Sequence, residues 1–454
     1  MEWDAEMDFG TMSYGEAEAF LLELPKHTVK NSLEETKRFL KVLGSPEEGC
    51  NIIHVAGTNG KGSVCAYLSS LLREAGCRTG MFTSPHLVEM RERFRVDGEM
   101  ITEEMFLWGL RCVMEHLDEA RLAVGRQDYH PTFFELLFLM GMVVFRKERV
   151  EYLVLETGLG GRLDATNAVE HPVLTLITEI GMDHTAYLGN TIAEIAGEKA
   201  GILKAGVPVV FCDKRKEASD VIRKRAQILE NRAVGVGKKD YVYRKLTNKS
   251  IDFSMQYRYY DYIRLSLATT AFYQMENAAV AVRGMEELQR VSTDRRLTSL
   301  TAGQVRRALA RTVWEGRMEE VLPGFFVDGA HNEDGIRAFA QSVKADGCKG
   351  RRILVFSAVA DKDIQGMTAI LRDGGLFAMA AVVGIHDKRA AETKWLRELL
   401  TLGGKLGEVM LFAGMEEALP ELRKRKKEDD FIYMVGSLYL IGEVKALLRR
   451  RTDD

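Results

Sequence analysis

Along much of the chain, short apolar runs alternate with longer segments in which apolar residues recur every three or four positions. From residue 51 onward each apolar run is followed by a polar or Gly-rich loop and then by an amphipathic segment. Short apolar runs between turn residues predict buried strands, and the longer period predicts helices. We predict strands over 51–55, 79–82, 152–155, 173–178 and 207–211, and a helix over 63–75 that ends at Gly76. The pattern is typical of a doubly wound α/β fold with a mostly parallel sheet.

The pattern changes after residue 240. Residues 241–267 alternate polar and apolar positions with many aromatics, which predicts antiparallel hairpins before a helix that contains 277–285. The polar stretch 292–299 predicts a linker, and the α/β pattern then resumes, with strands expected over 325–327, 353–356, 379–383, 409–412 and 431–435. At 454 residues the chain is too long for one core. We therefore predict a P-loop-type domain over 1–296 and a smaller, Rossmann-like α/β domain over 297–454.

Composition excludes several classes of protein. The formal net charge of -3 argues against a dedicated nucleic-acid binder, and the six cysteines form no CxxC pair that would suggest a zinc site. The acidic start MEWDAEMDFG lacks the features of a signal peptide, and the apolar run 133–145 is too short to cross a bilayer, so we predict a buried helix there. We expect a cytoplasmic monomer that binds small molecules, not membranes.

The loop after the first predicted strand carries the clearest chemical signal. It reads GTNGKGS and opens directly into a helix. Glycines let backbone N–H groups approach phosphate oxygens, the helix N-terminus adds partial positive charge, and Lys61 adds a full one. Because Gly62 separates Lys61 from Ser63, the loop departs from the usual Walker A spacing. A Gly-rich turn with a solvated lysine is the alternative, but the strand-loop-helix context favours a phosphate site.

Polar groups also follow the other predicted strands of the first domain. Ser84 follows the second strand, Glu156 ends the third, and Asp183-His184 follow the fourth. Ligands bind at the carboxyl ends of strands in such sheets. Each residue alone fits an ordinary structural role, such as a turn or a satisfied histidine. Together, a hydroxyl, a carboxylate and an imidazole around one phosphate loop predict a magnesium shell.

Other charged residues are less specific. Lys199 lies within the helical pattern EIAGEKAGIL, where a surface lysine is the default interpretation. In the second domain the segments WEGR, DGAHN and DKD place charges at strand ends or in loops. Loop charges are common, but ligands of two-domain enzymes draw contacts from both domains, so we predict nucleotide contacts from Arg317, Asp328 and His331.

The motifs, taken in order, resemble one family. GTNGKGS, TSPHL, GLGGRLDATN, DHTAYLGNTIAEIAGEKAGI, DGAHN, DKD and GSLYLIGEV occur in the order seen in the folylpolyglutamate and dihydrofolate synthases of the Mur ligase superfamily, across residues 25 to 445. The segment from Asp183 to Ile202 is the most specific, because no generic ATP-binding fold requires it.

The resemblance implies a set of site residues. It makes Lys61, Lys199 and His184 catalytic, and it makes Lys199 a carbamylated lysine that helps to place a second magnesium ion. The implied metal ligands are Ser84, Glu156, His184 and Lys199. The implied contacts to ATP are Gly57, Thr58, Asn59, Gly60, Lys61, Gly62, Ser63, Asn277, Arg317, Asp328 and His331. Substrate contacts are expected from Thr83, Pro85, His86, Arg162, Asp164 and Ala165.

Two positions depart from the family pattern. Glu333 replaces the proline that usually follows DGAHN, and Glu315 replaces the proline of the WPGR motif. Both residues flank expected nucleotide contacts, so the two departures concern the expected geometry of the loops more than the expected activity.

The resemblance implies that ATP and Mg²⁺ are used to join L-glutamate to folates through an acyl phosphate. The motif LDATN resembles that of bifunctional bacterial members, so we also expect dihydropteroate to be converted to dihydrofolate, with Asp164 accepting hydrogen bonds from the pterin. Asp164 as the cap of a turn is the alternative. Competing functions are another Mur-type amide ligase, which usually lacks the inserted Gly62, and a P-loop nucleotide-binding regulator, which needs no Glu156, His184 or Lys199.

Overall fold

The computed structural model describes residues 8–25, 31–258 and 260–453. Contacts between residues divide the chain into two compact units that interleave along the sequence. The first unit comprises residues 1–180, 193–236 and 280–308, and the second comprises 181–192, 237–279 and 309–454. The first seven residues, on which the expectation about export rests in part, lie outside the described residues.

The first unit is built on an eight-stranded sheet in the order β4-β3-β2-β5-β1-β6-β7-β8. Its strands are β1 (Asn51–Ala56), β2 (Thr79–Phe82), β3 (Phe94–Val96), β4 (Glu99–Met100), β5 (Tyr152–Glu156), β6 (Leu174–Ile177), β7 (Val209–Cys212) and β8 (Ala233–Val236). The pairs from β2 through β8 are parallel, whereas β3 and β4 form an antiparallel edge. Strand β1 therefore lies between β5 and β6, and the loops after all three strands leave from the same edge of the sheet.

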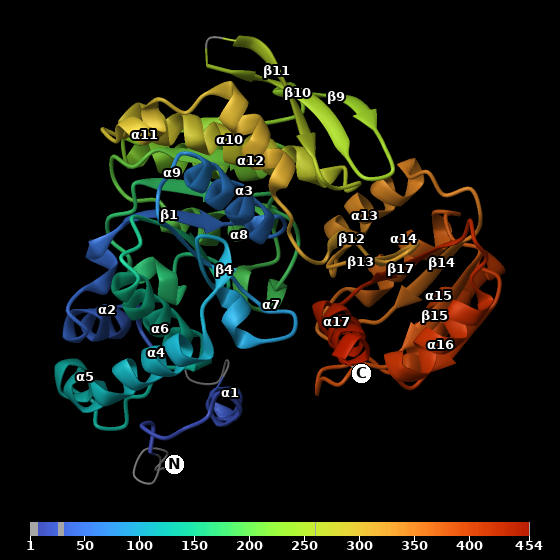
Figure 1. Cartoon of the computed structure of the whole chain (residues 1–454), viewed down its shortest axis with the longest axis horizontal. Coiled ribbons are helices and arrows are strands. Elements are labelled where there is room, and N and C mark those ends of the chain that lie inside the picture. The colour runs from blue at the N-terminus through green and yellow to red at the C-terminus, as the bar shows by residue number, and fades with distance from the viewer. Residues whose placement is uncertain (1–7, 26–30, 259, 454) are drawn as a thin grey trace. The chain divides into compact units, whose positions relative to one another are not determined.

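Helices cover both faces of this sheet. The helices of this unit are α1 (Tyr14–Glu23), α2 (Leu33–Val42), α3 (Lys61–Glu74), α4 (Glu103–Glu115), α5 (Leu117–Val124), α6 (Phe133–Lys147), α8 (Ile192–Lys199), α9 (Lys216–Ile228) and α11 (Arg295–Thr298), with α10 (Tyr273–Val291) and α12 (Ala302–Arg311) shared between the units. Figure 1 shows α2, α4 and α6 on one side of β1 and α3 with α10 on the other. The helix predicted over 133–145 is α6, and those residues are almost all buried in the core, as expected.

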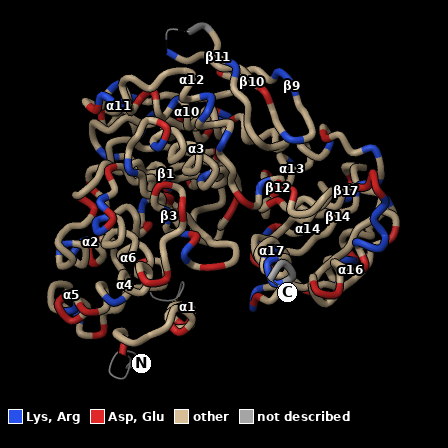
Figure 2. The backbone as a smooth tube through the Cα atoms, viewed as in Figure 1, with Lys and Arg blue, Asp and Glu red and all other residues tan. Residues whose placement is uncertain are grey.

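The second unit contains a six-stranded sheet in the order β12-β13-β17-β14-β15-β16. Its strands are β12 (Arg317–Leu322), β13 (Phe325–Asp328), β14 (Arg352–Phe356), β15 (Met379–Val383), β16 (Val409–Phe412) and β17 (Phe431–Val435). Strand β12 is antiparallel to β13, and the remaining neighbours are parallel. The helices are α7 (Thr185–Leu188), α13 (Glu333–Ala345), α14 (Ile364–Asp373), α15 (Thr393–Thr401), α16 (Met415–Arg425) and α17 (Leu438–Asp453). Charges gather on outer helices such as α16, whereas β15 and β17 have none (Figure 2).

The predicted hairpins form a separate three-stranded antiparallel sheet. Its strands are β9 (Tyr241–Leu246), β10 (Ile251–Tyr257) and β11 (Tyr260–Leu267), with β10 in the centre. Every strand predicted from an apolar run is present; most ends agree with the prediction, and the others differ by one or two residues. The stretch 292–299, predicted as a linker, contains helix α11, and its Arg296 pairs with Glu151 at 2.9 Å.

Within the described part of the chain, no helix is both long enough and apolar enough to cross a membrane.

Candidate active site

Glycines shape the loop that follows β1. Gly57 has a φ of +151°, and a Cβ placed on it would lie 1.8 Å from the Oγ1 atom of Thr178, so no side chain fits there. Gly60 has a left-handed φ of 89° and precedes the first residue of α3. Gly62 and Ser63 are buried in the first turn of that helix. Backbone N–H groups therefore gather at a helix N-terminus, which is an arrangement that suits a phosphate group.

The end of β6 holds this loop in place. The carbonyl oxygen of Glu179 accepts hydrogen bonds from the N–H groups of Thr58 and Asn59 at 2.8 and 3.2 Å. The Thr178 hydroxyl donates to the carbonyl oxygen of Asn59 at 2.7 Å. The Glu179 carboxylate forms an ion pair with Lys214. The predicted nucleotide loop is thus fixed by contacts that do not depend on a ligand.

Lys61, Glu156 and Ser84 meet at the carboxyl ends of β1, β5 and β2. The Glu156 carboxylate is almost fully buried, and its Oε1 atom lies 4.0 Å from the Lys61 Nζ atom. The backbone N–H of Ser84 donates to Glu156 Oε2 at 3.1 Å. Lys61 also donates to the carbonyl oxygen of Thr58 at 3.2 Å. The structure therefore brings together the predicted phosphate lysine and two of the predicted metal ligands.

Lys199 is buried, with only 3% of its surface exposed, although a surface lysine is the default interpretation of the sequence. It ends α8, and its neighbours Ala196, Ala200 and Ile202 are buried too. The Nζ atom donates a hydrogen bond to the carbonyl oxygen of Gly57 at 2.8 Å. The side chain thus reaches the phosphate loop, which the sequence pattern alone does not indicate.

The turn after β5 uses Asp164 as a cap. The carboxylate accepts hydrogen bonds from the Leu159 N–H at 2.8 Å, from the Thr166 N–H at 3.1 Å and from the Thr166 hydroxyl at 2.5 Å. Asp164 is 4% exposed, and the neighbouring Ala165 is buried as well. Arg162 is exposed and pairs with Glu198 at 2.8 Å. The capping role of Asp164 is therefore present in the structure, and its contact with a pterin stays a prediction.

A buried histidine that the sequence did not single out extends this network. His54, on β1, is fully buried, and its Nε2 atom lies 2.8 Å from the Thr166 hydroxyl. Because that hydroxyl donates to Asp164, the His54 Nε2 must be the donor, which leaves Nδ1 unprotonated. Burial, with a smaller effect from the Lys204 charge, lowers the pKa of His54 to about 3, so the ring is neutral near pH 7.

The remaining predicted substrate residues lie after β2. Thr83 is buried, and its N–H donates to the carbonyl oxygen of Arg93 at 3.1 Å. The Arg93 guanidinium donates from Nε to His86 Nδ1 at 2.9 Å. Pro85 follows a cis peptide bond and is exposed. Thr83 and His86 are thus linked through Arg93, which the sequence did not single out.

In the second unit, Asp183 is the centre of a cluster of polar side chains. Its carboxylate accepts hydrogen bonds from Lys362 Nζ at 2.5 Å and from Asn332 Nδ2 at 3.0 Å, and His331 Nε2 lies 3.6 Å away. The Lys362 Nζ atom also lies 3.4 Å from the Nε2 atom of His184. Burial opposes the charge on Asp183, but the neighbouring His331 and Lys362 side chains outweigh it and hold the pKa of Asp183 well below its usual range.

A second buried carboxylate, Asp328, ends β13. It accepts hydrogen bonds from the Tyr273 hydroxyl at 2.5 Å, from the Met318 N–H at 3.0 Å and from the Ala330 N–H at 2.9 Å. Burial raises its pKa in spite of these bonds and of the nearby Arg317 charge. Asp328 and Arg317, both predicted nucleotide contacts, therefore lie close together.

Asn277 and the two departures from the family pattern have local partners. The Asn277 amide donates to the Gln274 side chain at 3.0 Å. Glu315 pairs with Lys445 of α17 at 2.5 Å, and Glu333 pairs with Arg337 one turn further along α13. Both glutamates thus take part in ion pairs within the second unit.

The predicted site residues are divided between the units. The phosphate loop, Ser84, Glu156 and Lys199 belong to the first unit, and His184, Asn277, Arg317, Asp328 and His331 belong to the second. Among the described residues, no three His, Cys, Asp or Glu side chains form a metal-binding group by themselves. Asp183 and Lys362 occur in the DH and DKD motifs but were not predicted as site residues. Nothing in the sequence indicated Tyr273 or His54.

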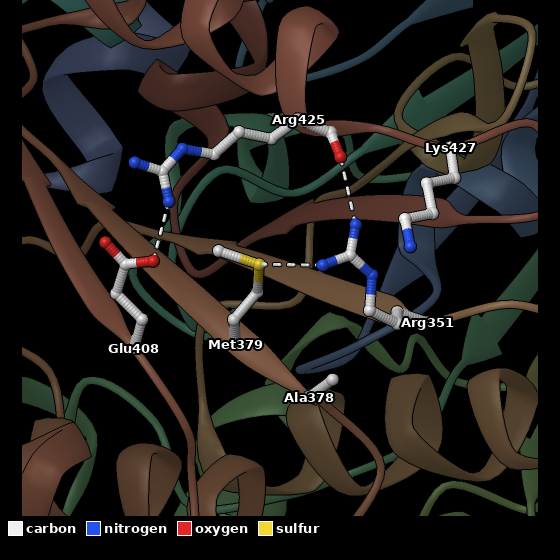
Figure 3. Close-up of a pocket in the computed structure, with 6 residues that line it drawn as sticks. All are labelled: Arg351, Ala378, Met379, Glu408, Arg425 and Lys427. Carbon is white, nitrogen blue, oxygen red and sulfur yellow. Dashed lines mark hydrogen bonds and ion pairs between the residues drawn. The ribbon is translucent and has the colours of Figure 1, made fainter.

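A separate pocket of about 430 Å³ opens at the other edge of the sheet in the second unit. It is lined by Arg351, Ala378, Met379, Glu408, Arg425 and Lys427 (Figure 3). The first four lie at or next to the amino ends of β14, β15 and β16, and the last two lie at and just after the end of α16. Arg425 pairs with Glu408 at 2.6 Å and Arg351 pairs with Asp430 at 2.7 Å. Ligands of such sheets bind at the carboxyl ends of strands, so this pocket lies apart from the predicted site.

Comparison with protein families defines the class. The Mur ligase middle domain matches residues 55–283, and the Mur ligase glutamate ligase domain matches residues 316–438. These two segments contain the phosphate loop, Glu156 and Lys199 in the first case and Asp328 and Lys362 in the second. The chain therefore contains both of these domains and belongs to the Mur ligase class of proteins.

Individual relatives narrow the class further. The dihydrofolate synthase/folylpolyglutamate synthase of Bacillus subtilis is 33% identical over 96% of this chain and 99% of its own length. The folylpolyglutamate synthase of Lacticaseibacillus casei is 30% identical over 96% of this chain and 99% of its own length. The chain belongs to the folylpolyglutamate synthase/dihydrofolate synthase family, and it is a ligase.

Solved structures agree with this assignment. Escherichia coli FolC in complex with DHPP and ADP has a TM-score of 0.82 at 26% identity, over 97% of this chain and 99% of that one. The Mycobacterium tuberculosis folylpolyglutamate synthase complexed with ADP and AMPPCP has a TM-score of 0.82 at 25% identity, over 96% of this chain and 98% of that one. The resemblance drawn from the motifs and the expected fold class are both confirmed, and the comparisons do not favour a P-loop regulator.

Proposed function

We propose that this enzyme uses ATP to join L-glutamate to folates. Membership of the family supports folates and glutamate as the substrates, since the relatives are named as folylpolyglutamate synthases. The observation that carries the proposal is the buried Lys199 Nζ atom on the Gly57 carbonyl oxygen, beside the Lys61 and Glu156 pair. A loop that only bound a nucleotide would need no second, buried lysine.

The reaction must activate a carboxylate, because an amine cannot displace oxide from it. We propose that the folate carboxylate attacks the γ-phosphorus of ATP, so that ADP leaves and an acyl phosphate forms. The amino group of L-glutamate then attacks the acyl carbon, phosphate leaves with the bonding electrons, and the nitrogen loses a proton. Lys61 and the backbone N–H groups of its loop would stabilise the charge on the transferred phosphoryl group.

Magnesium fits the donors that the first unit offers. The Glu156 carboxylate and the Ser84 hydroxyl are oxygen ligands, which Mg²⁺ prefers, and ATP oxygens and water would complete the shell. His184 in the second unit is the proposed imidazole ligand. When bound, the ion would neutralise phosphate charge. Glu156 lies 4.0 Å from Lys61, so the cationic side chain also balances the carboxylate when no ion is bound.

We also propose that Lys199 carries a carbamate. A lysine reacts with carbon dioxide only in its neutral form, and burial among apolar neighbours favours that form. Ala196, Ala200 and Ile202 supply such neighbours. The carbamate would present an anionic oxygen suited to magnesium, and its nitrogen would keep one N–H for the Gly57 carbonyl oxygen.

Conversion of dihydropteroate to dihydrofolate is the second proposed activity. Its support is the Bacillus subtilis relative, whose name gives both activities, and the LDATN motif of this chain. The Lacticaseibacillus casei relative is named only for the polyglutamate activity. The two activities therefore need separate tests.

One experiment tests both activities. Purified enzyme, ATP, Mg²⁺ and L-glutamate are incubated with tetrahydrofolate or with dihydropteroate, and the products are identified by mass spectrometry. We expect at least one glutamate to be added to each, with ADP released over many turnovers only when both the acceptor and glutamate are present. Sustained ADP release in the absence of both the acceptor and glutamate would overturn the proposed reaction. Extension of tetrahydrofolate without formation of dihydrofolate would overturn only the second activity.

For the domains, we propose a boundary near residue 296 and a monomeric state. The segments matched by the two family models leave residues 284–315 between them, and that interval contains the proposed boundary. Light scattering on the purified chain tests the monomer, for which the expected mass is 51.1 kDa. Twice that mass would overturn it.

A further inference from the structure

Asn167 joins two backbone segments that flank the phosphate loop. It is buried, with 4% of its surface exposed. Its Nδ2 atom donates hydrogen bonds to the carbonyl oxygen of Arg162 at 3.0 Å and to that of Gly201 at 3.2 Å. Arg162 belongs to the loop after β5, and Gly201 follows Lys199 by two residues. A single side-chain amide thus bridges the Glu156 loop and the Lys199 segment.

The same two segments touch through their backbones. The Arg162 N–H donates to the carbonyl oxygen of Glu198 at 2.7 Å. A Cβ on Gly161 would lie 2.9 Å from the Lys199 carbonyl oxygen, and a Cβ on Gly201 would lie 2.3 Å from the Cβ of Arg162. These approaches leave no room for side chains. The two segments therefore form one close-packed joint, and Asn167 closes it from within.

The joint bears directly on Lys199. Lys199 ends α8, and the turn from Ala200 to Ile202 follows it without a break. Holding Gly201 therefore holds the backbone from which the Lys199 side chain reaches the Gly57 carbonyl oxygen. A change at Asn167 would be transmitted to the phosphate loop through this side chain.

The contacts of Asn167 are not those expected of a residue that only stabilises the fold. Its Oδ1 atom is buried and has no hydrogen-bond partner among the described residues. A buried acceptor without a partner is unfavourable, and this offsets part of what the two donated bonds contribute. Both donors are nevertheless used. The Asn167 amide binds one carbonyl oxygen in each segment, and these two hydrogen bonds fix the distance between the segments.

We propose that Asn167 is a positioning residue for the ligase reaction. It holds the Lys199 segment against the loop after β5, so that the Lys199 Nζ atom stays at the Gly57 carbonyl oxygen. The inference rests on the proposed function, because only that function gives Lys199 a part in the chemistry. Asn167 is buried and its amide donates to two backbone carbonyl oxygens, so we expect its loss to affect the rate of the reaction and not the binding of substrates.

Two variants and one control test the proposal. Asn167→Ala removes both donors, and Asn167→Asp keeps the size but places a carboxylate against two carbonyl oxygens. Gln289→Ala is the control, because Gln289 is also buried in the first unit and its Nε2 atom donates to the Leu297 carbonyl oxygen at 3.0 Å. For each variant we would measure kcat, the KM values for ATP, folate and glutamate, and the melting temperature.

We expect kcat to fall by about 100-fold in Asn167→Ala and by at least as much in Asn167→Asp, with each KM within about threefold of the wild type, because a displacement of about 1 Å in a catalytic group has effects of this size. Gln289→Ala should lose comparable stability and keep its kcat. A kcat within about twofold of the wild type in Asn167→Ala would overturn the proposal, as would an equal loss in the control.

A crystal structure of Asn167→Ala separates this inference from the proposed function. We expect the Lys199 Nζ atom to have left the Gly57 carbonyl oxygen, and an unchanged contact would overturn the positioning role whatever the substrates are. A wild-type enzyme without activity on folates and glutamate would instead overturn the proposed function.

Discussion

The Lys199 Nζ atom lies 2.8 Å from the carbonyl oxygen of Gly57, a residue 142 positions earlier in the chain. The contact brings a buried lysine to the first bend of the phosphate loop. We predict that Lys199→Met, which keeps the length and removes the charge, lowers kcat on the order of 100-fold. Steady-state assays check this result. A crystal grown with bicarbonate and nucleotide should show a carbamate on the wild-type lysine, and an unmodified Lys199 that points to solvent would contradict the carbamate.

Removal of Lys61 should abolish ligation and leave the fold intact. The residue begins α3, and its ammonium group faces the loop and Glu156 instead of the apolar core. We expect Lys61→Ala to lower kcat at least about 100-fold, because a full positive charge at the transferred phosphoryl group is lost. ADP formation and the melting temperature are measured together. Lys224→Ala, on the exposed face of α9, is the control and should behave like the wild type.

The Asp183 and Lys362 pair should stabilise the second unit strongly. Both side chains are largely buried, so removing one partner leaves a buried charge. We expect Asp183→Asn to lower the free energy of unfolding by about 3–5 kcal/mol near pH 7, and the double variant with Lys362→Met to recover part of that loss.

The pH dependence of the same variant follows from the lowered pKa of Asp183. A carboxyl with a lowered folded pKa stabilises above its unfolded pKa of about 3.9, and the effect is lost as the pH falls further. The difference between wild type and Asp183→Asn should therefore be complete near pH 7 and shrink below about pH 4. Urea unfolding at several pH values measures it, and a difference that grew with acid would contradict the assignment.

His54 should make the first unit sensitive to mild acid. Its pKa is lowered to about 3 by burial, whereas an unfolded histidine titrates near 6.5. Its neutral form thus favours the folded state above about pH 6.5, and this contribution is lost as the pH falls toward 3. Between about pH 6 and 4 the free energy of unfolding should fall by about 1.4 kcal/mol per pH unit more steeply in the wild type than in His54→Gln. Parallel slopes in urea unfolding would show that the ring is protonated in the folded state.

A variant of Asp164 distinguishes a cap from a pterin contact. The carboxylate already accepts three hydrogen bonds from Leu159 and Thr166. If capping is its whole role, Asp164→Asn should cost about 1–3 kcal/mol of stability and leave the KM for dihydropteroate unchanged. If it also binds the pterin, that KM should rise while the KM for ATP stays constant. The two KM values and the melting temperature together decide between the roles.

Much of the fold follows from local pattern, whereas the site depends on long-range contacts. Strands such as β15 and β17 are continuous apolar runs, which can be predicted from composition alone. Gly384 follows β15, and Asp430 and Gly436 flank β17. Short edge strands such as β4 were not predicted, because a pair of residues such as Glu99 and Met100 has no period. The hairpins over 241–267 were predicted from their alternation.

The phosphate loop could be predicted because its residues are adjacent in sequence. The burial of Lys199 could not, because its partner Gly57 is distant and its helix has too few residues for a clear period. His54 and Asn167 gave no signal, since a polar residue in an apolar strand or a loop shows its role only when its partners are known. Motif resemblance supplied what periodicity could not, namely the expected roles of Lys199 and Asn277.

The path of the chain constrains how such a protein can be divided or recombined. Residues 181–192 leave the first unit after β6, belong by their contacts to the second unit, and return at α8. A fragment that begins at residue 297 would carry Lys362 and Asn332 without the Asp183 carboxylate that both of them contact. Exchange of the carboxyl-terminal part between relatives therefore combines Lys362 and Asn332 of one parent with the segment 181–192 of the other, unless these twelve residues are exchanged as well. A chimera with a single junction contains a polar cluster of mixed origin, whereas one that also exchanges 181–192 keeps the cluster of one parent.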